Sequence, residues 1–383
     1  MKAFHKKKIL IYLRYYLPGY GSGGPVISIL NMVKALSHSY EFYIVCLSND
    51  FGEKKVYKNV SGLSWKNFGG AKVLHLDKYK SPFASSLDIV QKLEPEIVYF
   101  NSFLDPFFTF IPLLHYQKKE IKVIIAPRGE LTPGALSLTA LKKKLYIYIF
   151  MKSFILNKIT WHASTETELN QISSNIGISP KKIYVAKDIA LFDKSQPKFN
   201  QSYKEYNKLK IVFLARITPV KNLMYILDVL KFCDSDIVFD IYGAVDEKKY
   251  WDQCKKKINS LPKTISVNYF GLISNELVNQ TLADYHLFFL PTLGENFGHS
   301  IFEALSVGVP VLISDQTLWT KIVNNCNYAA IPLKDQRKYV DFIQHLSKMD
   351  NDEFDDLNSH AAKVFNKYIS STNQTTPYNE LFS

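Results

Sequence analysis

The sequence predicts two α/β domains, each built on a mainly parallel sheet with helices on both faces. Strand-like and helix-like hydrophobic patterns alternate along most of the chain, and its 383 residues exceed one typical hydrophobic core. The pattern lapses between Lys187 and Lys210, where a polar, lysine-rich stretch containing a proline is typical of a linker. We therefore expect an N-terminal domain over residues 1–190, a C-terminal domain over 205–365 and a tail over 366–383.

The N-terminal domain is expected to begin with a strand that runs into a glycine-rich turn. Seven strands are predicted before the linker, over residues 8–17, 40–48, 71–76, 96–101, 121–126, 159–163 and 183–186. The turn after the first strand, residues 18–25, leads into a helix over 26–36. Glycines there let the backbone approach a ligand closely at a helix N-terminus. Their spacing does not fit G-x-G-x-x-G, so this turn is not the dinucleotide-binding fingerprint.

The C-terminal domain is expected to repeat the alternation. Strands are predicted over 211–216, 237–242 and 265–270, helices over 247–260 and 274–285, and a final helical region over 337–368. Between them lie a strand at 286–291, a loop with Gly294 and Gly298, a short helix, and a strand at 309–314. Gly308 stands where a helix C-terminus favours glycine, and the proline two residues later cannot continue the helix. This strand–loop–helix–strand unit contains the strongest functional signal in the chain.

Two carboxylates lie in this unit, Glu295 in the loop and Glu303 in the helix. His299 and Glu303 are four residues apart and share one helical face, directed back toward the loop. The backbone N–H groups that open the helix favour an anion, and ligands of such sheets bind beyond the carboxyl ends of the strands. An anion on these groups, with hydroxyls on the two glutamates, describes a sugar nucleotide. The alternative is a buried βαβ unit with two solvated glutamates, although an unpaired carboxylate between Phe302 and Ala304 would be costly.

The stretch from Glu295 to Val311, ENFGHSIFEALSVGVPV, resembles the E-x7-E signature of retaining glycosyltransferases of family 4, which have the GT-B fold. The resemblance implies two Rossmann-like domains facing across a cleft, with C-terminal helices that return to the first domain. It also implies transfer of a hexose from a nucleoside diphosphate sugar to a hydroxyl, with retention at the anomeric carbon. Glu295 would bind hydroxyls of the transferred sugar, and Glu303 those of the ribose. The donor site would also include the matching positions Asn296, Phe297, Gly298 and His299.

Two cations follow the first predicted strand of the C-terminal domain. Arg216 ends this strand, Lys221 comes five residues later, and the next helix begins directly after it. Two cations beside a helix N-terminus form a pocket for a diphosphate, whereas a random pair of this kind would be surface charges. They match the R-x4-K pair with which the resembling family binds the donor diphosphate, so we assign them, with Glu295, to catalysis. Gly243 and Gly271 end strands on the same rim and are expected to flank the nucleobase.

Fewer site residues are predicted in the N-terminal domain. The resembling family has a glycine-rich loop at the position of Gly23 and Gly24, where it faces the donor phosphates and the acceptor. Arg128 and Gly129 follow a strand end, where Arg128 either binds a phosphate or carboxylate or pairs with the glutamate two residues later. The family's catalytic histidine has no counterpart in this neighbourhood. His162, at another strand end, is expected to be a core histidine.

The net charge of +12 suits nucleic acid, an anionic membrane surface or anionic small substrates. No nucleic-acid-binding motif accompanies it, so nucleic acid is not expected as a partner. Residues 141–158, LKKKLYIYIFMKSFILNK, join lysines to a run of apolar residues. This composition is typical of an amphipathic helix on an anionic membrane. It also fits an ordinary helix packed on the sheet with its lysines in solvent, which is the interpretation that the sequence favours.

The four cysteines are scattered without metal-ligand spacing, which indicates free thiols in a reducing compartment. The start of the chain does not have the pattern of a cleaved signal peptide, and no apolar run is long enough to span a membrane. We therefore expect a cytoplasmic protein, with peripheral attachment to the inner face of the plasma membrane as an option.

These observations together predict a hexosyltransferase that takes part in the synthesis of cell-surface polysaccharide or glycolipid. Its partners would be a nucleoside diphosphate sugar and a saccharide or lipid-linked saccharide acceptor. No D-x-D-like element stands in the motifs, so neither a cofactor nor an obligatory metal is expected. Two other classes stay open: a nucleotide-sugar epimerase of similar architecture, and a non-catalytic basic protein that docks on membranes.

Overall fold

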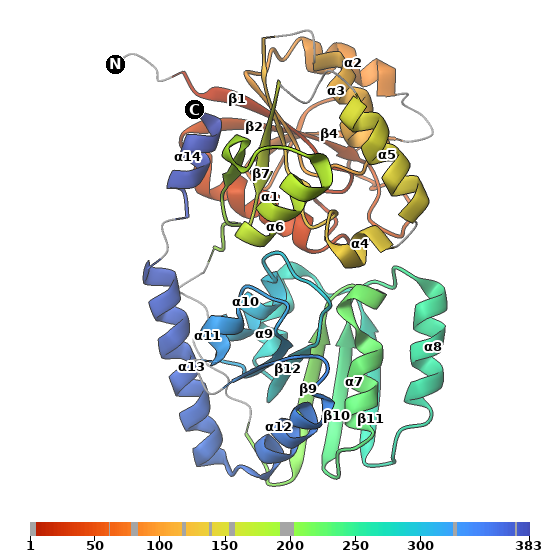
Figure 1. Cartoon of the computed structure of the whole chain (residues 1–383), viewed down its shortest axis with the longest axis vertical. Coiled ribbons are helices and arrows are strands. Elements are labelled where there is room, and N and C mark those ends of the chain that lie inside the picture. The colour runs from red at the N-terminus through yellow and green to blue at the C-terminus, as the bar shows by residue number, and fades with distance from the viewer. Residues whose placement is uncertain are drawn as a thin grey trace. The chain divides into compact units, whose positions relative to one another are not determined.

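The computed structural model describes residues 5–60, 62–77, 83–116, 120–137, 140–152, 158–191, 203–324, 328–371 and 374–383. The chain divides into two compact units, one formed by residues 1–191 with 373–383 and the other by 192–372. Each unit is a Rossmann-like layer of parallel strands with helices packed on it (Figure 1). The predicted fold class, α/β with two such units, is therefore confirmed.

The first unit is built on an eight-stranded sheet in the order β3-β4-β2-β1-β5-β6-β7-β8. Its strands are β1 (Lys7–Tyr12), β2 (Tyr40–Leu47), β3 (Lys66–Phe68), β4 (Ala71–Leu76), β5 (Ile97–Phe100), β6 (Lys122–Ile125), β7 (Ile159–Ala163) and β8 (Ile183–Val185). Neighbouring strands run parallel except β3, which is antiparallel to β4. The sequence does not predict β3 because Lys-Asn-Phe forms no apolar run. The first strand ends at Tyr12 instead of residue 17, since Tyr16 and Leu17 are buried as part of the following loop.

Apolar side chains fill both faces of this sheet. The helices are α1 (Gly24–Leu36), α2 (Phe83–Gln91), η1 (Pro106–Phe110), α3 (Ile111–Tyr116), α4 (Pro133–Ser137), α5 (Ala140–Lys152), α6 (Glu166–Ile176), η3 (Pro180–Lys182) and α14 (Thr376–Phe382). Side chains alternate along β1, so Ile9 and Ile11 join one cluster and Leu10 and Tyr12 join the other. The first cluster includes side chains of α1 and α14, and the second includes side chains of α3, α5 and α6.

The C-terminal segment forms part of the core of the first unit. Tyr378, Leu381 and Phe382 of α14 are almost fully buried there, and the Phe382 ring lies 5.4 Å from that of Tyr40. The tail is predicted from residue 366, but residues 366–371 still belong to a helix of the second unit. Of the predicted tail, the described residues 374–383 belong to the first unit.

The second unit is built on a six-stranded sheet in the order β11-β10-β9-β12-β13-β14, in which all neighbours pair in parallel. Its strands are β9 (Lys208–Leu214), β10 (Asp236–Tyr242), β11 (Ile265–Gly271), β12 (Leu287–Leu290), β13 (Val311–Ser314) and β14 (Ala329–Ile331). Its helices are η4 (Pro219–Lys221), α7 (Leu223–Leu230), α8 (Lys248–Ile258), α9 (Asn275–Leu282), α10 (His299–Ser306), α11 (Thr320–Asn324), α12 (Gln336–Lys348) and α13 (Asn351–Ser371).

The strand order of each sheet reverses at one point, and a ligand of such a sheet is expected to bind there. In the second unit the sheet extends from β9 toward β11 in one direction and from β12 toward β14 in the other. In the first unit the same reversal falls between β1 and β5. Loops that leave neighbouring strands in opposite directions open a crevice at the carboxyl ends, which is where ligands of such sheets bind.

Among the described residues, no helix is both long and apolar enough to cross a membrane.

Candidate functional site

The loops after β9 and β12 are tied together at the reversal point of the second unit. The backbone N–H of Leu293 donates to the carbonyl of Val220 at 2.8 Å, and the Thr292 hydroxyl donates to the same carbonyl at 3.1 Å. The Asn222 side chain donates to the carbonyl of Pro291 at 3.0 Å. Because of these bonds, the segment that contains Arg216 and Lys221 and the segment that contains Glu295 form one continuous rim.

Lys221 and Glu295 make direct contact on this rim, through Nζ and Oε2. Both side chains are largely buried, with exposed fractions of 18% and 14%. The sequence assigns them to different parts of a donor, the diphosphate and the sugar, yet the structure places their charges together. A pair at this position can hold a ligand in which a phosphate lies next to a hydroxyl, since the ammonium donates and the carboxylate accepts.

Arg216 lies on the same rim and pairs with Asp246, with Nη1 and Oδ2 3.0 Å apart. About a third of each side chain is exposed, so this ion pair is open to solvent and contributes little to stability. Asp246 follows the end of β10 and is absent from the sequence-based assignment. The signal for it would have been an acidic residue just after a strand that neighbours β9. The guanidinium is thus held at the rim while part of it faces solvent.

The loop before α10 has a backbone shape that requires glycine. Gly298 has φ +79°, and a Cβ there would come within 3.0 Å of both Glu295 Cγ and Ile301 Cδ1. The indole N–H of Trp319 donates to the carbonyl of Phe297, and the two rings are 5.5 Å apart. This buried tryptophan, which the sequence does not single out, holds the loop at the start of α10. The position of the loop relative to the helix therefore depends on packing against Trp319 as well as on the backbone conformation of Gly298.

The carboxyl group of Glu303 has no protein partner among the residues that the structure describes. It is partly buried in α10 between the buried Phe302 and Ala304, and no hydrogen bond or ion pair reaches its carboxylate from the described part of the chain. Loss of hydration raises its pKa from 4.5 to about 8, so the folded protein holds a proton there at neutral pH. A costly arrangement of this kind is common where a ligand completes the hydrogen bonds.

Gly243 and Gly271 lie next to each other at the ends of β10 and β11. The N–H of Gly243 donates to the carbonyl of Gly271 at 2.7 Å. Gly243 has φ +139°, and a Cβ there would collide with the carbonyl of Ala215, which immediately precedes Arg216. The two glycines therefore lie at adjoining strand ends close to Arg216, and a contact with a nucleobase stays a prediction.

In the first unit, an aspartate holds the glycine-rich turn in place. Asp50, buried just beyond β2, accepts two contacts from the N–H of Gly21, at 3.0 and 3.1 Å. The turn then reaches Gly23, which has φ +67° and precedes the first residue of α1, Gly24. Sequence reasoning did not find Asp50, for which the signal would be an acidic residue at the carboxyl end of β2. It is a positioning residue for the turn.

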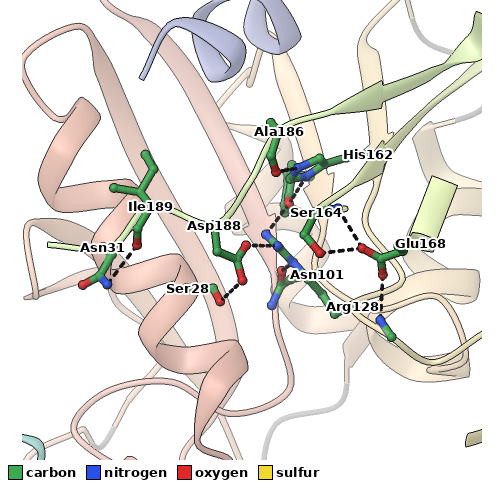
Figure 2. Close-up of polar contacts among 12 residues, drawn as sticks. Ser28, Asn31, Asn101, Arg128, His162, Ser164, Glu168, Ala186, Asp188 and Ile189 are labelled. Carbon is green, nitrogen blue, oxygen red and sulfur yellow. Dashed lines mark hydrogen bonds and ion pairs between the residues drawn. The ribbon is translucent and has the colours of Figure 1, made fainter. Parts of the chain in front are cut away.

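Arg128 belongs to an internal network and not to an open anion site (Figure 2). Its Nε donates to Asn101 at 2.7 Å, its Nη2 donates to the Tyr99 hydroxyl at 2.7 Å, and its Nη1 contacts Asp188. Only 7% of the side chain is exposed. The predicted role in binding a phosphate is therefore not supported by the structure, because all three nitrogens already donate to protein groups.

The alternative prediction, an ion pair between Arg128 and Glu130, is wrong. The Glu130 carboxylate accepts from the Ser102 hydroxyl at 2.7 Å and from the N–H groups of Phe103 and Leu104 at 2.6 and 2.8 Å. Burial raises the pKa of this carboxylate, while those three bonds act in the opposite direction.

Glu168 of α6 restrains the same loop. It accepts from the N–H of Gly129 at 2.7 Å and from the hydroxyl of Ser164 at 2.6 Å. The Gly129 N–H is therefore used inside the protein too, and it is no longer a candidate for binding a phosphate. The carboxylates of Glu130 and Glu168 together hold the loop after β6 in place.

The network continues to α1 and to the segment after β8 (Figure 2). Asp188 accepts from the Ser28 hydroxyl at 2.7 Å, and the Asn31 side chain donates to the carbonyl of Ile189 at 3.0 Å. His162 lies at 2.7 Å from the Tyr99 hydroxyl and at 2.8 Å from the carbonyl of Ala186. Burial lowers the pKa of His162 to about 3, so it is a neutral core histidine, as predicted.

Three comparisons place the chain among known proteins. Residues 195–363 match the family described as Glycosyl transferases group 1. The crystal structure of Anabaena Alr3699/HepE in complex with UDP and glucose superposes with a TM-score of 0.71 at 15% identity, covering 98% of both chains. The chain has the GT-B fold. Its two Rossmann-like units are the two halves of that fold, and the family match falls on the second of them.

Two curated relatives match part of the chain in sequence. A Klebsiella pneumoniae protein described as an uncharacterized 41.2 kDa protein in the cps region is 24% identical over 55% of this chain and 56% of its own length. The GtfA subunit of a UDP-N-acetylglucosamine–peptide N-acetylglucosaminyltransferase from Streptococcus agalactiae is 22% identical over 51% of this chain and 38% of its own. The chain thus spans about half the length of these relatives or less.

We predict that removing Asp188, the buried partner of Arg128, destabilises the first unit strongly. In Asp188→Ala a buried guanidinium loses its counter-charge, which should lower the free energy of unfolding by roughly 3–5 kcal/mol. The matched control, Ser28→Ala, removes only a neutral donor from the same carboxylate and should cost about 1 kcal/mol. Urea unfolding followed by far-UV circular dichroism measures both. Equal losses in the two variants would mean that Arg128 is hydrated in place.

A second prediction follows from the raised pKa of Glu303. Between pH 4.5 and about 8 the folded state holds a proton that the unfolded state has lost, so stability falls as the pH rises through this range. Glu303→Gln should remove that loss and stabilise the protein more at pH 8 than at pH 5, by roughly 1–3 kcal/mol for a partly exposed group. Glu276→Gln, at an exposed position in α9, serves as the control. A pH-independent difference for Glu303→Gln would contradict the shifted pKa.

Proposed function

We propose that the protein is a retaining glycosyltransferase that moves a hexose from a nucleoside diphosphate sugar to a hydroxyl group of an acceptor. The observation that carries the proposal is the meeting of Lys221 with Glu295 on the rim that also holds Arg216 and leads into α10. The family match over residues 195–363 supports it, as does the UDP and glucose bound to the structurally similar Anabaena protein.

In this proposal the donor lies along the rim. Its charged diphosphate contacts cations and backbone N–H groups, and its neutral hydroxyls contact glutamates. Arg216, Lys221 and the N–H groups at the start of α10 receive the diphosphate, where negative charge increases as the bond to the anomeric carbon breaks. Glu295 accepts hydrogen bonds from hydroxyls of the sugar beside that bond. Glu303 forms hydrogen bonds with the ribose hydroxyls, which supply the partners that its carboxyl group lacks among the described residues. The acceptor oxygen bonds to the anomeric carbon, and its proton is released.

Electrostatic stabilisation in this scheme comes from side chains and backbone dipoles. Two cations and a helix N-terminus can offset the charge of a leaving diphosphate, so we propose that the reaction requires no metal ion and no further cofactor. We also propose an acceptor that is a saccharide or a lipid-linked saccharide, and a role in cell-surface polysaccharide or glycolipid synthesis. The relative from the cps region of Klebsiella pneumoniae is consistent with that role. Cys46, Cys233 and Cys254 are free and buried, which is consistent with a cytoplasmic location.

Incubation with a panel of sugar nucleotides and candidate saccharide acceptors tests the activity. Release of nucleoside diphosphate together with a glycosylated product would support transfer, and NMR of the new anomeric centre would show whether configuration is retained. Conversion of the donor into a stereoisomer without release of nucleoside diphosphate would instead identify an epimerase. Absence of turnover and of nucleotide binding across the panel would contradict the proposal.

The diphosphate assignment predicts a loss of nucleotide affinity. A charge-assisted hydrogen bond to a phosphate contributes roughly 1.5–3 kcal/mol, so Arg216→Ala and Lys221→Ala should each weaken nucleoside diphosphate binding by about tenfold or more. Lys231→Ala is the matched control, because it removes an exposed cation beyond the other end of α7. Isothermal titration calorimetry compares the three. If all three variants bind as the unmodified protein does, the rim is not the diphosphate site.

Changing each of the two glutamates to glutamine should affect different kinetic and binding constants. Glu303→Gln touches a part of the donor that does not react, so KM should rise and nucleoside diphosphate affinity should fall. Glu295→Gln affects the sugar beside the breaking bond, so kcat should fall while affinity for the sugar-free nucleoside diphosphate stays near that of the unmodified protein. Turnover kinetics and calorimetry on each variant separate these effects. The opposite pattern would show that the two roles are exchanged.

A further inference from the structure

Helix α5 is apolar on both of its faces, although it lies on the surface of the first unit. Its inner face is closed, with Phe150 fully buried and Ile147 nearly so. Its outer face carries Leu141, Leu145 and Tyr148, whose exposed fractions are 87%, 59% and 60%. A surface helix of a globular protein normally turns a polar face to water, so this outer face lacks the usual solvent-facing composition.

Lysines border this outer face. At 100° per residue, Lys142 and Lys144 lie on opposite flanks of the stripe formed by Leu141, Leu145 and Tyr148, and all four of the helix's charged residues are lysines. The ammonium of Lys152 lies 5.8 Å from the centre of the Tyr148 ring. Lysines at the edges of an apolar stripe can lay their methylene stems along it while the ammonium groups reach outward. The helix therefore combines an apolar ridge with positive charge on both sides.

A second apolar element adjoins this helix. The ring of Phe110, at the end of η1, lies 6.0 Å from that of Tyr146 and 6.3 Å from that of Phe150, so η1 packs beside α5. Helix α3 follows η1 directly and lies near α5 (Figure 1). η1 and α3 in turn expose Phe107 (57%), Ile111 and Leu114. Residues 106–116 contain no carboxylate.

The exposed apolar side chains of the first unit are concentrated here. Eleven large hydrophobic residues of this unit are exposed among those that the structure describes, and eight of them belong to η1, α3 and α5. The eight are Phe107, Ile111, Leu114, Leu141, Leu145, Tyr148, Ile149 and Met151, and together with Lys142, Lys144 and Lys152 they define the α3–α5 surface. Contiguous apolar areas of this kind mark sites of protein or membrane interaction.

We propose that the α3–α5 surface binds an anionic lipid membrane. Apolar side chains would enter the boundary between headgroups and acyl chains, and the lysines would contact anionic headgroups. A second copy of the chain is a poorer fit, because an isologous contact would bring lysines of both copies together without a carboxylate from either α5 or residues 106–116. The net charge of +12 favours the same partner. The proposal goes beyond the catalytic assignment and does not depend on it.

Co-sedimentation of the full chain with vesicles tests the proposal. The protein should bind vesicles of phosphatidylcholine mixed with phosphatidylglycerol, bind pure phosphatidylcholine vesicles much less, and lose binding as salt rises, because screening weakens the attraction. Leu141→Ser with Leu145→Ser should lower the partition coefficient by roughly tenfold per leucine. Lys142→Gln, Lys144→Gln and Lys152→Gln should each lower it about fivefold.

Matched substitutions on the second unit control for general effects of polarity and charge. Leu277→Ser, at a leucine that is 51% exposed, and Lys256→Gln, at an exposed lysine of α8, should leave vesicle binding unchanged. Circular dichroism and melting curves establish that each variant is folded.

Three results would overturn the proposal: equal retention by charged and neutral vesicles, variants of the α3–α5 surface that bind like the unmodified protein, or controls that lose binding equally. A protein that ignores vesicles but is dimeric by light scattering, and becomes monomeric with Leu141→Ser and Leu145→Ser, would assign the surface to a second copy instead.

Discussion

The pairing of β9 with β12 is the constraint on which the proposed site depends. Because the sheet reverses its order there, the loops that follow these two strands leave in different directions and share one edge. Hydrogen bonds from Asn222, Thr292 and Leu293 then lock the two loops together. The charges of Lys221 and Glu295 meet as a consequence of this topology. Any change that separates β9 from β12 would disperse the whole rim, whatever residues it carried.

The charged groups of the two units show how environment decides between structure and function. Arg128 and Asp188 are almost fully buried and every charged nitrogen of the arginine has a protein partner, so their contact holds the first unit together. Arg216 keeps about a third of its side chain exposed, and Glu303 has no partner in the described part of the chain. A solvent-accessible cation and a carboxyl group without a partner among the described residues are groups that a ligand can reach.

The sequence predicted the positions of the charged residues in the second unit better than the surroundings of Arg128 in the first, and their roles in binding stay predictions. In the second unit the strands are short apolar runs, and Arg216, Lys221 and Glu295 follow strand ends that the topology brings to one edge. In the first unit Arg128 also follows a strand end, but it turns inward to Asp188. That partner lies 60 residues later in a stretch with no recognisable pattern. Asp50 was missed for the same reason, since nothing local links it to the turn at Gly21.

The sequence by itself determined most of the order of strands and helices, though not the short strand β3, because periodicity and turn chemistry are local properties. It also determined the glycine after α10 and the placement of charged residues beyond strand ends. Only the tertiary structure decided that Lys221 contacts Glu295, 74 residues away, and that Arg128 is closed off from solvent. It also decided which side of α5 is covered. Both of its faces are apolar, so the periodicity of the sequence cannot distinguish the face that packs on the sheet from the face that stays exposed.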